Sequence, residues 1–243
     1  MQVSAKSFLY NNVDKVCGLR PNIPIVILSP HLDDAAWSLG AILKQLSEAG
    51  HALYIINIFS ISPAIYGRMI TPAEATTVRV KEDRAVYKIL GCKVTNLDFP
   101  DGLLRDRSLE DVFDARYVAP SYLSDAIARS VQEHITPDAI VLAPSGFGMH
   151  IDHLTTRRVA ERLTNKVIFY EDFPYATRTV RIAEALNFLQ GRGLTEFRFT
   201  VTREVIDEHI RIYNLYTSQR ADHHVEQIRT YLLAHGFGLW MMS

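Results

Sequence analysis

Cysteine is scarce in this sequence, and neither sign of charge is in clear excess. Two cysteines among 243 residues, Cys17 and Cys92, are too few for the disulfide framework of a small secreted protein. Lysine and arginine together number 26, against 27 aspartates and glutamates, so no overall field would attract nucleic acid or an anionic membrane. We therefore expect no nucleic-acid partner.

Long apolar runs are also missing. No stretch reaches the length of about 20 apolar residues that is needed to span a bilayer. Residues Met1–Pro24 lack the continuous apolar segment, between a basic start and a small-residue cleavage site, of a secretory signal. These absences predict a cytoplasmic protein without a membrane anchor. The length suits a single domain over residues 1–243, with a core at about 24–220, and oligomeric state is not indicated.

Strand-like and helix-like patterns alternate along most of the chain. The expected strands are Ile25–Ser29, Ala52–Phe59, Val94–Phe99, Ala139–Ala143 and Val167–Tyr170. The expected helices are Ala36–Ala49, Pro72–Leu90, Tyr122–His134, Asp152–Leu163 and Arg203–Tyr216. This alternation predicts a Rossmann-like α/β fold, a three-layer sandwich with a mainly parallel sheet. The segment Tyr175–Arg203 breaks the pattern, with a turn at Gly191–Gly193 and a late antiparallel strand expected at Phe197–Val201.

Two polar clusters follow two of the expected strands. His31-Leu32-Asp33-Asp34 comes directly after Ile25–Ser29, and His150-Ile151-Asp152-His153 comes after Ala139–Ala143. In open α/β sheets, ligands bind in the crevice beyond the carboxyl ends of the strands. We therefore expect the two clusters to converge there, and their imidazoles and carboxylates indicate a metal site.

The predicted metal ligands are His31, Asp34 and His153. A spacing of three on a turn into a helix can direct His31 and Asp34 at one ion, and His153 opens the helix after the second cluster. Hydrolytic zinc sites use about three nitrogen or oxygen ligands and leave a position open for water. Two nitrogens and one oxygen suit Zn²⁺ and tolerate Fe²⁺ or Co²⁺. The alternative is that the aspartates only cap the following helix.

Metal-assisted hydrolysis also needs a base and a hydrogen-bond donor or acid. Asp33, which adjoins a predicted ligand but is not needed as one, is the candidate base. His150 is the candidate electrophile or acid, and Asp152 could fix the tautomer of a histidine. Alternatively, His150 and Asp152 serve only the loop, whose backbone Gly146 and Gly148 mark as unusual.

At these residues the chain resembles the GlcNAc-phosphatidylinositol de-N-acetylase family, also called PIG-L or LmbE-like zinc deacetylases. The family combines a post-strand His-Pro-Asp-Asp-Glu with a later His-Pro-Asp-His. The similar segments here are Ser29–Ala35, Arg79–Glu82, Leu90-Gly91, Phe99–Leu103, His150–His153 and Tyr216–Gln219. They follow the family's order across most of the chain. Ala35 replaces the family's usual glutamate, and Leu32 and Ile151 replace prolines that stiffen loops.

The resemblance implies a role for each of these residues. The three predicted ligands would bind zinc, and Asp33 would be the general base. His150 would stabilise the tetrahedral intermediate or protonate the amine. Arg79 and Asp101 match positions that contact sugar hydroxyls. The alternatives are a surface ion pair or a helix charge for Arg79 and a turn former for Asp101. Because the missing glutamate is not one of the ligands, Ala35 is expected to mark a subgroup rather than an inactive enzyme.

The resemblance thus implies a metal-dependent hydrolase that removes an N-acetyl group from an N-acetylglucosamine-type conjugate, giving acetate and a free amine. The expected partner is a small-molecule amino-sugar conjugate, and no aglycone is indicated. One alternative is a zinc amidase on a non-sugar amide, which the Arg79 and Asp101 matches disfavour. The other is a catalytically silent sugar-binding relative. The presence of a base together with three metal ligands disfavours it, because a silent protein would need neither.

Three other features have simpler readings. His223-His224 is not expected to bind metal, because adjacent residues on a helix do not face one ion well. Cys92 is expected to pack in the core. The run Phe169–Tyr175 could form part of a substrate wall, with its acidic pair Glu171-Asp172 receiving the freed amine, or it could only pack the core and cap a loop.

Overall fold

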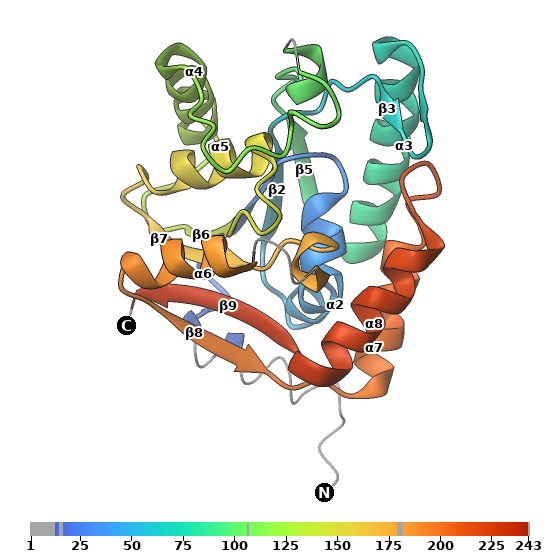
Figure 1. Ribbon diagram of the computed structural model, residues 1–243. Coiled ribbons are helices and arrows are strands. Elements are labelled where there is room, and N and C mark those ends of the chain that lie inside the picture. Colours follow the sequence, from blue (N-terminus) through green and yellow to red (C-terminus); the bar gives the residue numbers. More distant parts are fainter. Residues whose placement is uncertain (1–12, 15–16, 106, 179–181, 243) are drawn as a thin grey trace, which may run out of the picture.

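A seven-stranded sheet forms the centre of the molecule (Figure 1). The computed structural model describes residues 13–14, 17–105, 107–178 and 182–242. The strands, in spatial order, are β5 (Lys93–Asn96), β2 (Leu53–Asn57), β1 (Ile25–Ser29), β6 (Ile140–Pro144), β7 (Lys166–Tyr170), β9 (Phe237–Met242) and β8 (Leu194–Phe199). The first five run parallel, and β9 is antiparallel to both of its neighbours.

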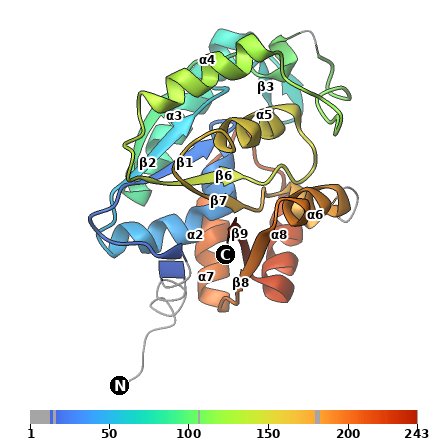
Figure 2. The ribbon, with the colours of Figure 1, turned by 90° about the vertical axis from the view of Figure 1, so that its left-hand side faces the viewer.

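Helices cover both faces of this sheet. The described helices are α2 (Asp34–Glu48), α3 (Pro72–Leu90), α4 (Ser121–Gln132), α5 (Ile151–Ala160), α6 (Ile182–Gly191), α7 (Arg203–Tyr213) and α8 (Asp222–His235), with 3₁₀ turns η1 (Gly102–Leu104) and η2 (Tyr175–Thr177). Figure 2 shows α2 and α7 on one side of the sheet and α4 and α5 on the other. A separate short hairpin consists of β3 (Ala64–Ile65) and β4 (Arg68–Met69). The predicted three-layer α/β fold is confirmed.

Local chemistry accounts for the elements that the sequence predicted well. Every residue of β1 is buried, as expected for a parallel strand that is covered on both faces and reads as a continuous apolar run. Helix α3 begins where predicted because Thr71 accepts the N–H of Glu74 while the Glu74 carboxylate accepts the N–H of Thr71. It ends at Gly91, whose φ of 69° is the left-handed conformation that glycine adopts without strain.

Several predicted boundaries differ from the observed ones. The strand predicted over Val94–Phe99 ends at Asn96, because the chain turns at Asp98, which has a φ of 56°. The helix predicted over Arg203–Tyr216 ends at Tyr213, since the last three residues form a turn. The late strand β8 is antiparallel, as predicted, but begins three residues earlier than expected. Helices α6 and α8, strand β9 and the β3–β4 hairpin were not predicted.

The order of the strands decides where a ligand can approach. From β1 the chain builds outward through β2 to β5, and it then returns to the other side of β1 to form β6. The crevice beyond the carboxyl ends of β1 and β6 is therefore the topological switch point of the sheet. Both polar clusters of the sequence follow these two strands, so they meet at the switch point.

The helices of the described residues give no candidate for a membrane span, since none combines sufficient length with sufficient apolar character. Of the segment Met1–Pro24, which was assessed for a secretory signal, residues 1–12 and 15–16 lie outside the described part of the chain.

Candidate metal centre and active site

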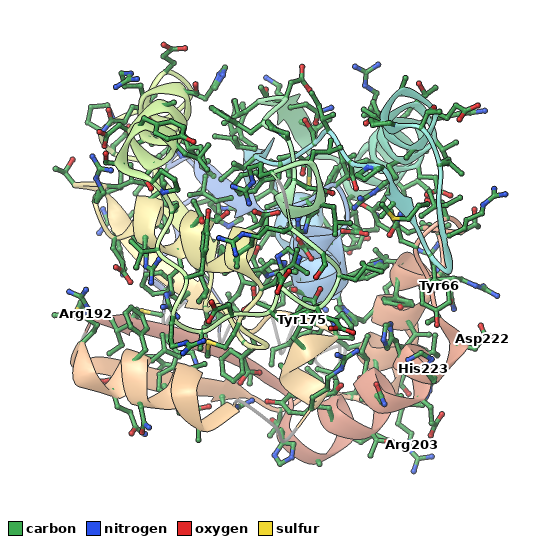
Figure 3. The ribbon with its side chains drawn as sticks, turned by 45° about the horizontal axis from the view of Figure 1, so that its top comes forward. Tyr66, Tyr175, Arg192, Arg203, Asp222 and His223 are labelled. Carbon is green, nitrogen blue, oxygen red and sulfur yellow. The ribbon has the colours of Figure 1, made fainter. Side chains whose placement is uncertain are left out.

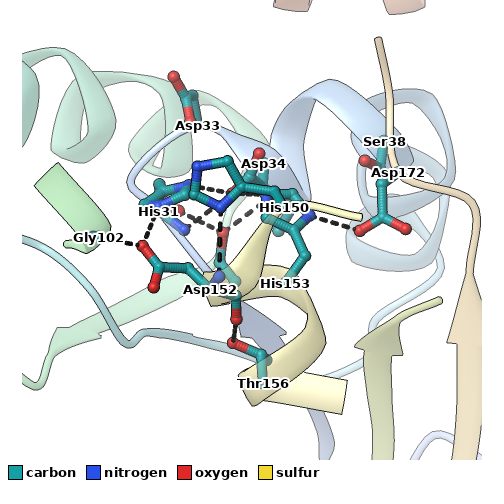
Figure 4. Close-up of polar contacts among 12 residues, drawn as sticks. His31, Asp33, Asp34, Ser38, Gly102, His150, Asp152, His153, Thr156 and Asp172 are labelled. Atoms are coloured by element: carbon teal, nitrogen blue, oxygen red, sulfur yellow. Dashed lines mark hydrogen bonds and ion pairs between the residues drawn. The ribbon is translucent and has the colours of Figure 1, made fainter. Parts of the chain in front are cut away.

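The predicted ligands His31, Asp34 and His153 come together at the switch point (Figure 4). Their nearest donor atoms all lie within 4.8 Å of one another. His31 Nδ1 is 3.0 Å from Asp34 Oδ2, and His153 Nε2 is 3.1 Å from the same oxygen. His31 follows β1, Asp34 begins α2, and His153 lies in the first turn of α5. One oxygen and two imidazole nitrogens thus face a common point.

Each of the two histidines is held on its other ring nitrogen by a carboxylate. His31 Nε2 lies 3.0 Å from Asp152 Oδ2, and His153 Nδ1 lies 2.7 Å from Asp172 Oδ1. A carboxylate behind a ligating histidine fixes the tautomer and the orientation of the ring and makes the free nitrogen a better metal ligand. Asp152 therefore occupies the tautomer-fixing position that the sequence indicated, and Asp172 performs the same task for the second histidine.

A second group of three donors, His31, His150 and Asp152, also clusters here. Asp152, however, is already engaged, because its Oδ2 accepts the N–H of Gly102 at 2.9 Å and its Oδ1 pairs with Arg105. A carboxylate satisfied in this way by the protein is a poor additional metal ligand. The group formed by His31, Asp34 and His153 is the better candidate.

The chemistry of that group fits a divalent cation. His153 Nε2 is fully buried and makes no hydrogen bond, although it points at the Asp34 carboxylate. Burial lowers the pKa of His153, but the Asp34 carboxylate and the hydrogen bond to Asp172 outweigh it and raise the pKa to about 10. The site thus attracts positive charge, and two nitrogens with one oxygen match the ligand types and number of hydrolytic zinc sites.

Asp33 stands beside this group without a capping function. It occupies the N-cap position of α2, but its side chain makes no capping hydrogen bond. Its Oδ2 instead lies 3.4 Å from Nη2 of Arg79, a buried residue of α3. Burial raises the pKa of Asp33, and the neighbouring guanidinium of Arg79 partly opposes that rise. The alternative that this aspartate is only a helix cap is therefore wrong.

His150 combines a structural contact with a place in the cavity. Its Nδ1 accepts the N–H of Asp152 at 3.2 Å, so the side chain caps α5, as the loop alternative expected. Burial and the charge of His31 lower the pKa of His150 to about 3, so its ring is neutral. With Nδ1 accepting, the proton of a neutral ring resides on Nε2. Met149 and Gly148 precede it with φ values of 60° and 84°, which confirms the unusual loop backbone.

A cavity of about 370 Å³ opens over these groups. Its lining includes His31, Asp33, Asp34, Arg79, Asp101, His150, Tyr175, Tyr66 and Gln219. Asp101 is buried and its Oδ1 accepts the N–H of Leu103 at 2.9 Å, so the turn-forming alternative holds for that oxygen. Arg79 is buried beside Asp33 rather than exposed, so the alternative of a surface ion pair is wrong. Contact of Arg79 and Asp101 with sugar hydroxyls stays a prediction.

The segment Phe169–Tyr175 contributes to the cavity only in part. The ring of Tyr175 lines it and lies edge-on to His153, with the ring centroids 5.3 Å apart. Glu171 instead pairs with Arg198, and neither Glu171 nor Asp172 lines the cavity. The expectation that this acidic pair receives the freed amine is wrong, because both carboxylates are already engaged inside the protein.

Sequence reasoning missed the roles of Asp172 and Arg105. Asp172 follows β7, the next strand beyond β6, so the rule that placed the two polar clusters at strand ends could have found it. Arg105 carries no comparable signal, because its partner Asp152 is distant in sequence. His224 lies apart from the metal-site group, with its Nδ1 3.2 Å from the Tyr213 hydroxyl, and Cys92 packs half-buried against the core, as predicted.

Fold and site together define a class of protein: a Rossmann-like domain with a candidate His-Asp-His metal site, and the free Asp33 carboxylate beside it, at its switch point. The chain belongs to the PIG-L family, since residues 26–164 match the family model described as GlcNAc-PI de-N-acetylase. The resemblance inferred from the motifs is confirmed.

Individual relatives are similar over most of the chain. A 2'-N-acetylparomamine deacetylase of Streptomyces fradiae is 26% identical over 214 residues, which cover 83% of this chain and 75% of that protein. The zinc-inhibited form of a teicoplanin deacetylase has a TM-score of 0.66 at 22% identity, over 89% of this chain and 97% of that one. GalB of Pseudomonas putida, a 4-carboxy-2-hydroxymuconate hydratase, has a TM-score of 0.56 at 18% identity, over 87% and 85%. The two structures establish a shared fold, and their names show that it serves more than one reaction.

Proposed function

We propose that the protein hydrolyses the N-acetyl group of an N-acetylglucosamine-type conjugate and releases acetate and a free amine. This proposal rests on one observation. The Asp33 carboxylate, which makes no capping hydrogen bond to α2, lies in the same cavity as the group formed by His31, Asp34 and His153. The description of the family and the name of the Streptomyces fradiae relative support an amino-sugar amide as the substrate.

Zn²⁺ is the proposed cofactor, and His31, Asp34 and His153 would hold it. A cation of this kind polarises an amide carbonyl and lowers the pKa of water. The oxygen of a water molecule would attack the carbonyl carbon of the amide, and Asp33 would accept the proton that this water loses. The same carboxyl would return the proton to the nitrogen as the C–N bond breaks. The raised pKa of Asp33 suits this exchange, because burial favours the protonated form that the first step creates.

His150 would stabilise the negative charge that develops on the amide oxygen. Because its Nδ1 accepts a backbone N–H, its Nε2–H is the group left to donate to that oxygen. Asp152 would not touch the substrate and would act through His31, whose ring it orients. The proposal thus distinguishes two catalytic residues, Asp33 and His150, from one positioning residue, Asp152.

Arg79 and Asp101 are the proposed contacts for the sugar hydroxyls. Both side chains are buried at the cavity, where Arg79 offers hydrogen-bond donors and Asp101 offers acceptors.

Release of acetate from a panel of substrates tests the proposal. The panel pairs N-acetylglucosaminides with simple N-substituted acetamides, and each is assayed with Zn²⁺, Co²⁺ or Fe²⁺ and after chelation. We expect metal-dependent release from the glycosides. Because one structural relative is described as zinc-inhibited, zinc is added from below one equivalent upward. Equal rates on simple acetamides would indicate a non-sugar amidase, and no acetate from any amide would overturn the proposal.

A further inference from the structure

The β3–β4 hairpin forms one lip of the cavity and presents Tyr66 at its tip. Ala64, Ile65, Tyr66 and Gly67 all line the cavity. Ile65 pairs with Arg68, so Tyr66 and Gly67 form a two-residue turn, in which Gly67 has a φ of 77°. The ring of Tyr66 is therefore carried on a short, sharply turned segment rather than on a long loop.

A second segment, residues 218–219, holds this hairpin in place. The N–H of Tyr66 donates to the carbonyl oxygen of Ser218 at 2.7 Å, and Nε2 of Gln219 donates to the carbonyl oxygen of Ala64 at 3.1 Å. Figure 3 accordingly places Tyr66 beside the chain that precedes α8, away from the more central Tyr175. The tip of the hairpin is thus anchored to residues 218–219.

Glu82 of α3 fixes that second segment in turn. Its Oε1 accepts the N–H of Ser218 at 2.9 Å and the hydroxyl of Thr217 at 2.6 Å, and its Oε2 accepts the hydroxyl of Ser218 at 2.5 Å. One carboxylate therefore receives three hydrogen bonds from two adjacent residues. These contacts link α3, the 217–219 segment and the hairpin into a continuous support for Tyr66.

Exposure places Tyr66 at the mouth of the cavity and the reacting groups at its floor. Tyr66 is 53% exposed, whereas Asp33 is 4% exposed. An acetamide that reaches Asp33 must have its sugar inside the cavity, so the group attached to the sugar emerges at the mouth. Leu109, 63% exposed, lines the same cavity, so both exposed side chains offer apolar surface to that group.

We infer that Tyr66 is a specificity-determining residue that packs against a ring of the aglycone, and that Glu82 positions it. This inference rests on the proposed function, because it assumes that an amino sugar occupies the cavity. An aromatic face and an aliphatic side chain suit the flat, weakly polar face of an aryl or sugar ring. A methyl aglycone is too small to gain from this contact.

The test compares methyl, phenyl and 4-linked N-acetylglucosaminyl β-glycosides of N-acetylglucosamine in the metal-loaded full chain. We expect one or both ring aglycones to be preferred through a lower KM. In Tyr66→Ala the KM for the preferred ring glycoside should rise about 3- to 10-fold, the scale of an aromatic contact, with kcat and the methyl glycoside unchanged. Tyr66→Phe keeps the ring and should behave like the wild type.

Glu82→Gln tests the positioning role. It should reproduce part of the rise in KM for the ring glycoside, because an amide is a weaker acceptor for the three donors. Glu74→Gln is the matched control, since Glu74 lies on the same helix and its carboxylate hydrogen-bonds Thr71 at the helix start. Equal changes on methyl and ring glycosides, or a loss in Tyr66→Phe as large as in Tyr66→Ala, would overturn the inference.

A binding measurement separates this inference from the proposed function. Calorimetry on Asp33→Asn, with and without Tyr66→Ala, gives the affinities for the methyl and ring glycosides without turnover. If ring glycosides bind more tightly through Tyr66 but the wild type releases no acetate, the inference stands and the proposed function fails. If acetate is released but Tyr66→Ala changes neither KM nor affinity, the function stands and the inference fails.

Discussion

At the scale of single residues, the carboxylates behind the histidines matter as much as the predicted ligands. Asp172 Oδ1 holds His153 at 2.7 Å, and its Oδ2 accepts the N–H groups of Gly146 and Phe147 at 2.7 and 3.0 Å. One side chain thus orients a histidine of the candidate metal site and shapes the loop that leads to His150. An asparagine could not accept all of these hydrogen bonds.

We expect Asp172→Asn to weaken metal affinity by about 10- to 100-fold, because His153 loses the partner that fixes its ring. Competition with a chromophoric chelator measures the affinity. Glu171→Gln is the control, since the neighbouring Glu171 pairs with Arg198 away from the site and its loss should leave metal affinity unchanged. Equal affinity in all three proteins would mean that His153 needs no support.

Asp33 and Asp34 should separate base from ligand. Asp33→Asn keeps the shape but cannot accept a proton, so kcat should fall by about 100-fold or more while metal content stays near one per chain. His153→Ala should lose most of the metal. Elemental analysis beside the acetate assay checks both, and a metal-free Asp33→Asn with a metal-replete Asp34→Asn would show that the two carboxylates had been assigned in reverse.

Some residues of the site can be predicted from the sequence and others cannot. His31, Asp34 and His153 could be grouped because each follows a buried strand that the local pattern reveals. Arg105 could not, because nothing near it in the sequence indicates that its guanidinium will meet Asp152. Contacts of this kind depend on how the loops fold over the sheet, which no local pattern encodes.

At the scale of elements, the loop between β6 and α5 shapes the active site through backbone conformation. A Cβ on Gly148 would lie 2.6 Å from Cβ of Tyr175, a distance that side chains do not tolerate. The left-handed φ of 84° adds strain for any residue but glycine. The loop can therefore run close under Tyr175 only because residue 148 has no side chain.

We expect Gly148→Ala to lower kcat/KM by about 10- to 100-fold, because Tyr175 and His150 would shift together. Gly50→Ala is a matched control: its φ is 88°, but a Cβ there meets nothing within 4 Å. Both variants should lose about 1 kcal/mol of stability to backbone strain. Gly148→Ala should lose more through its contact with Tyr175, and it alone should lose activity. Urea unfolding and the acetate assay distinguish the two effects.

The elements themselves were predicted unevenly. Buried parallel strands such as β1 and β6 stand out as short β-branched runs, and α3 has a clear start and stop. Strand β9 is also a continuous apolar run, yet its position between β7 and β8 depends on pairing with residues far away in sequence. The two-residue strands β3 and β4 are too short for any periodicity to show.

At the scale of the whole molecule, the stability of the metal-free protein depends on the protonation of two buried histidines. Burial lowers the pKa of His31, but the Asp34 carboxylate and the hydrogen bond to Asp152 outweigh it and raise the pKa to about 9, while that of His153 rises to about 10. Both folded values exceed the ordinary value of 6.5. Their contribution to stability is therefore complete below pH 6.5 and is lost as the pH rises toward 9 and 10.

We expect the metal-free protein to lose on the order of 1–3 kcal/mol of unfolding free energy between pH 7 and pH 8.5. The buried histidines His150, His209 and His224, with pKa values lowered to about 3, 4 and 4, change charge below this window. Urea titrations at the two pH values measure the loss. It should shrink in His153→Gln and in the zinc-loaded protein, and an unchanged loss in both would assign it to other groups.

The placement of β9 also has a consequence for how the protein is made. β8 precedes β9 in the chain, yet β9 lies between β7 and β8 and joins them. Until residues 237–242 have left the ribosome, the edge of β7 that later pairs with β9 has no partner strand, and β8 has no sheet to join. Until β9 has emerged, a growing chain therefore presents an open strand edge that can pair with another chain.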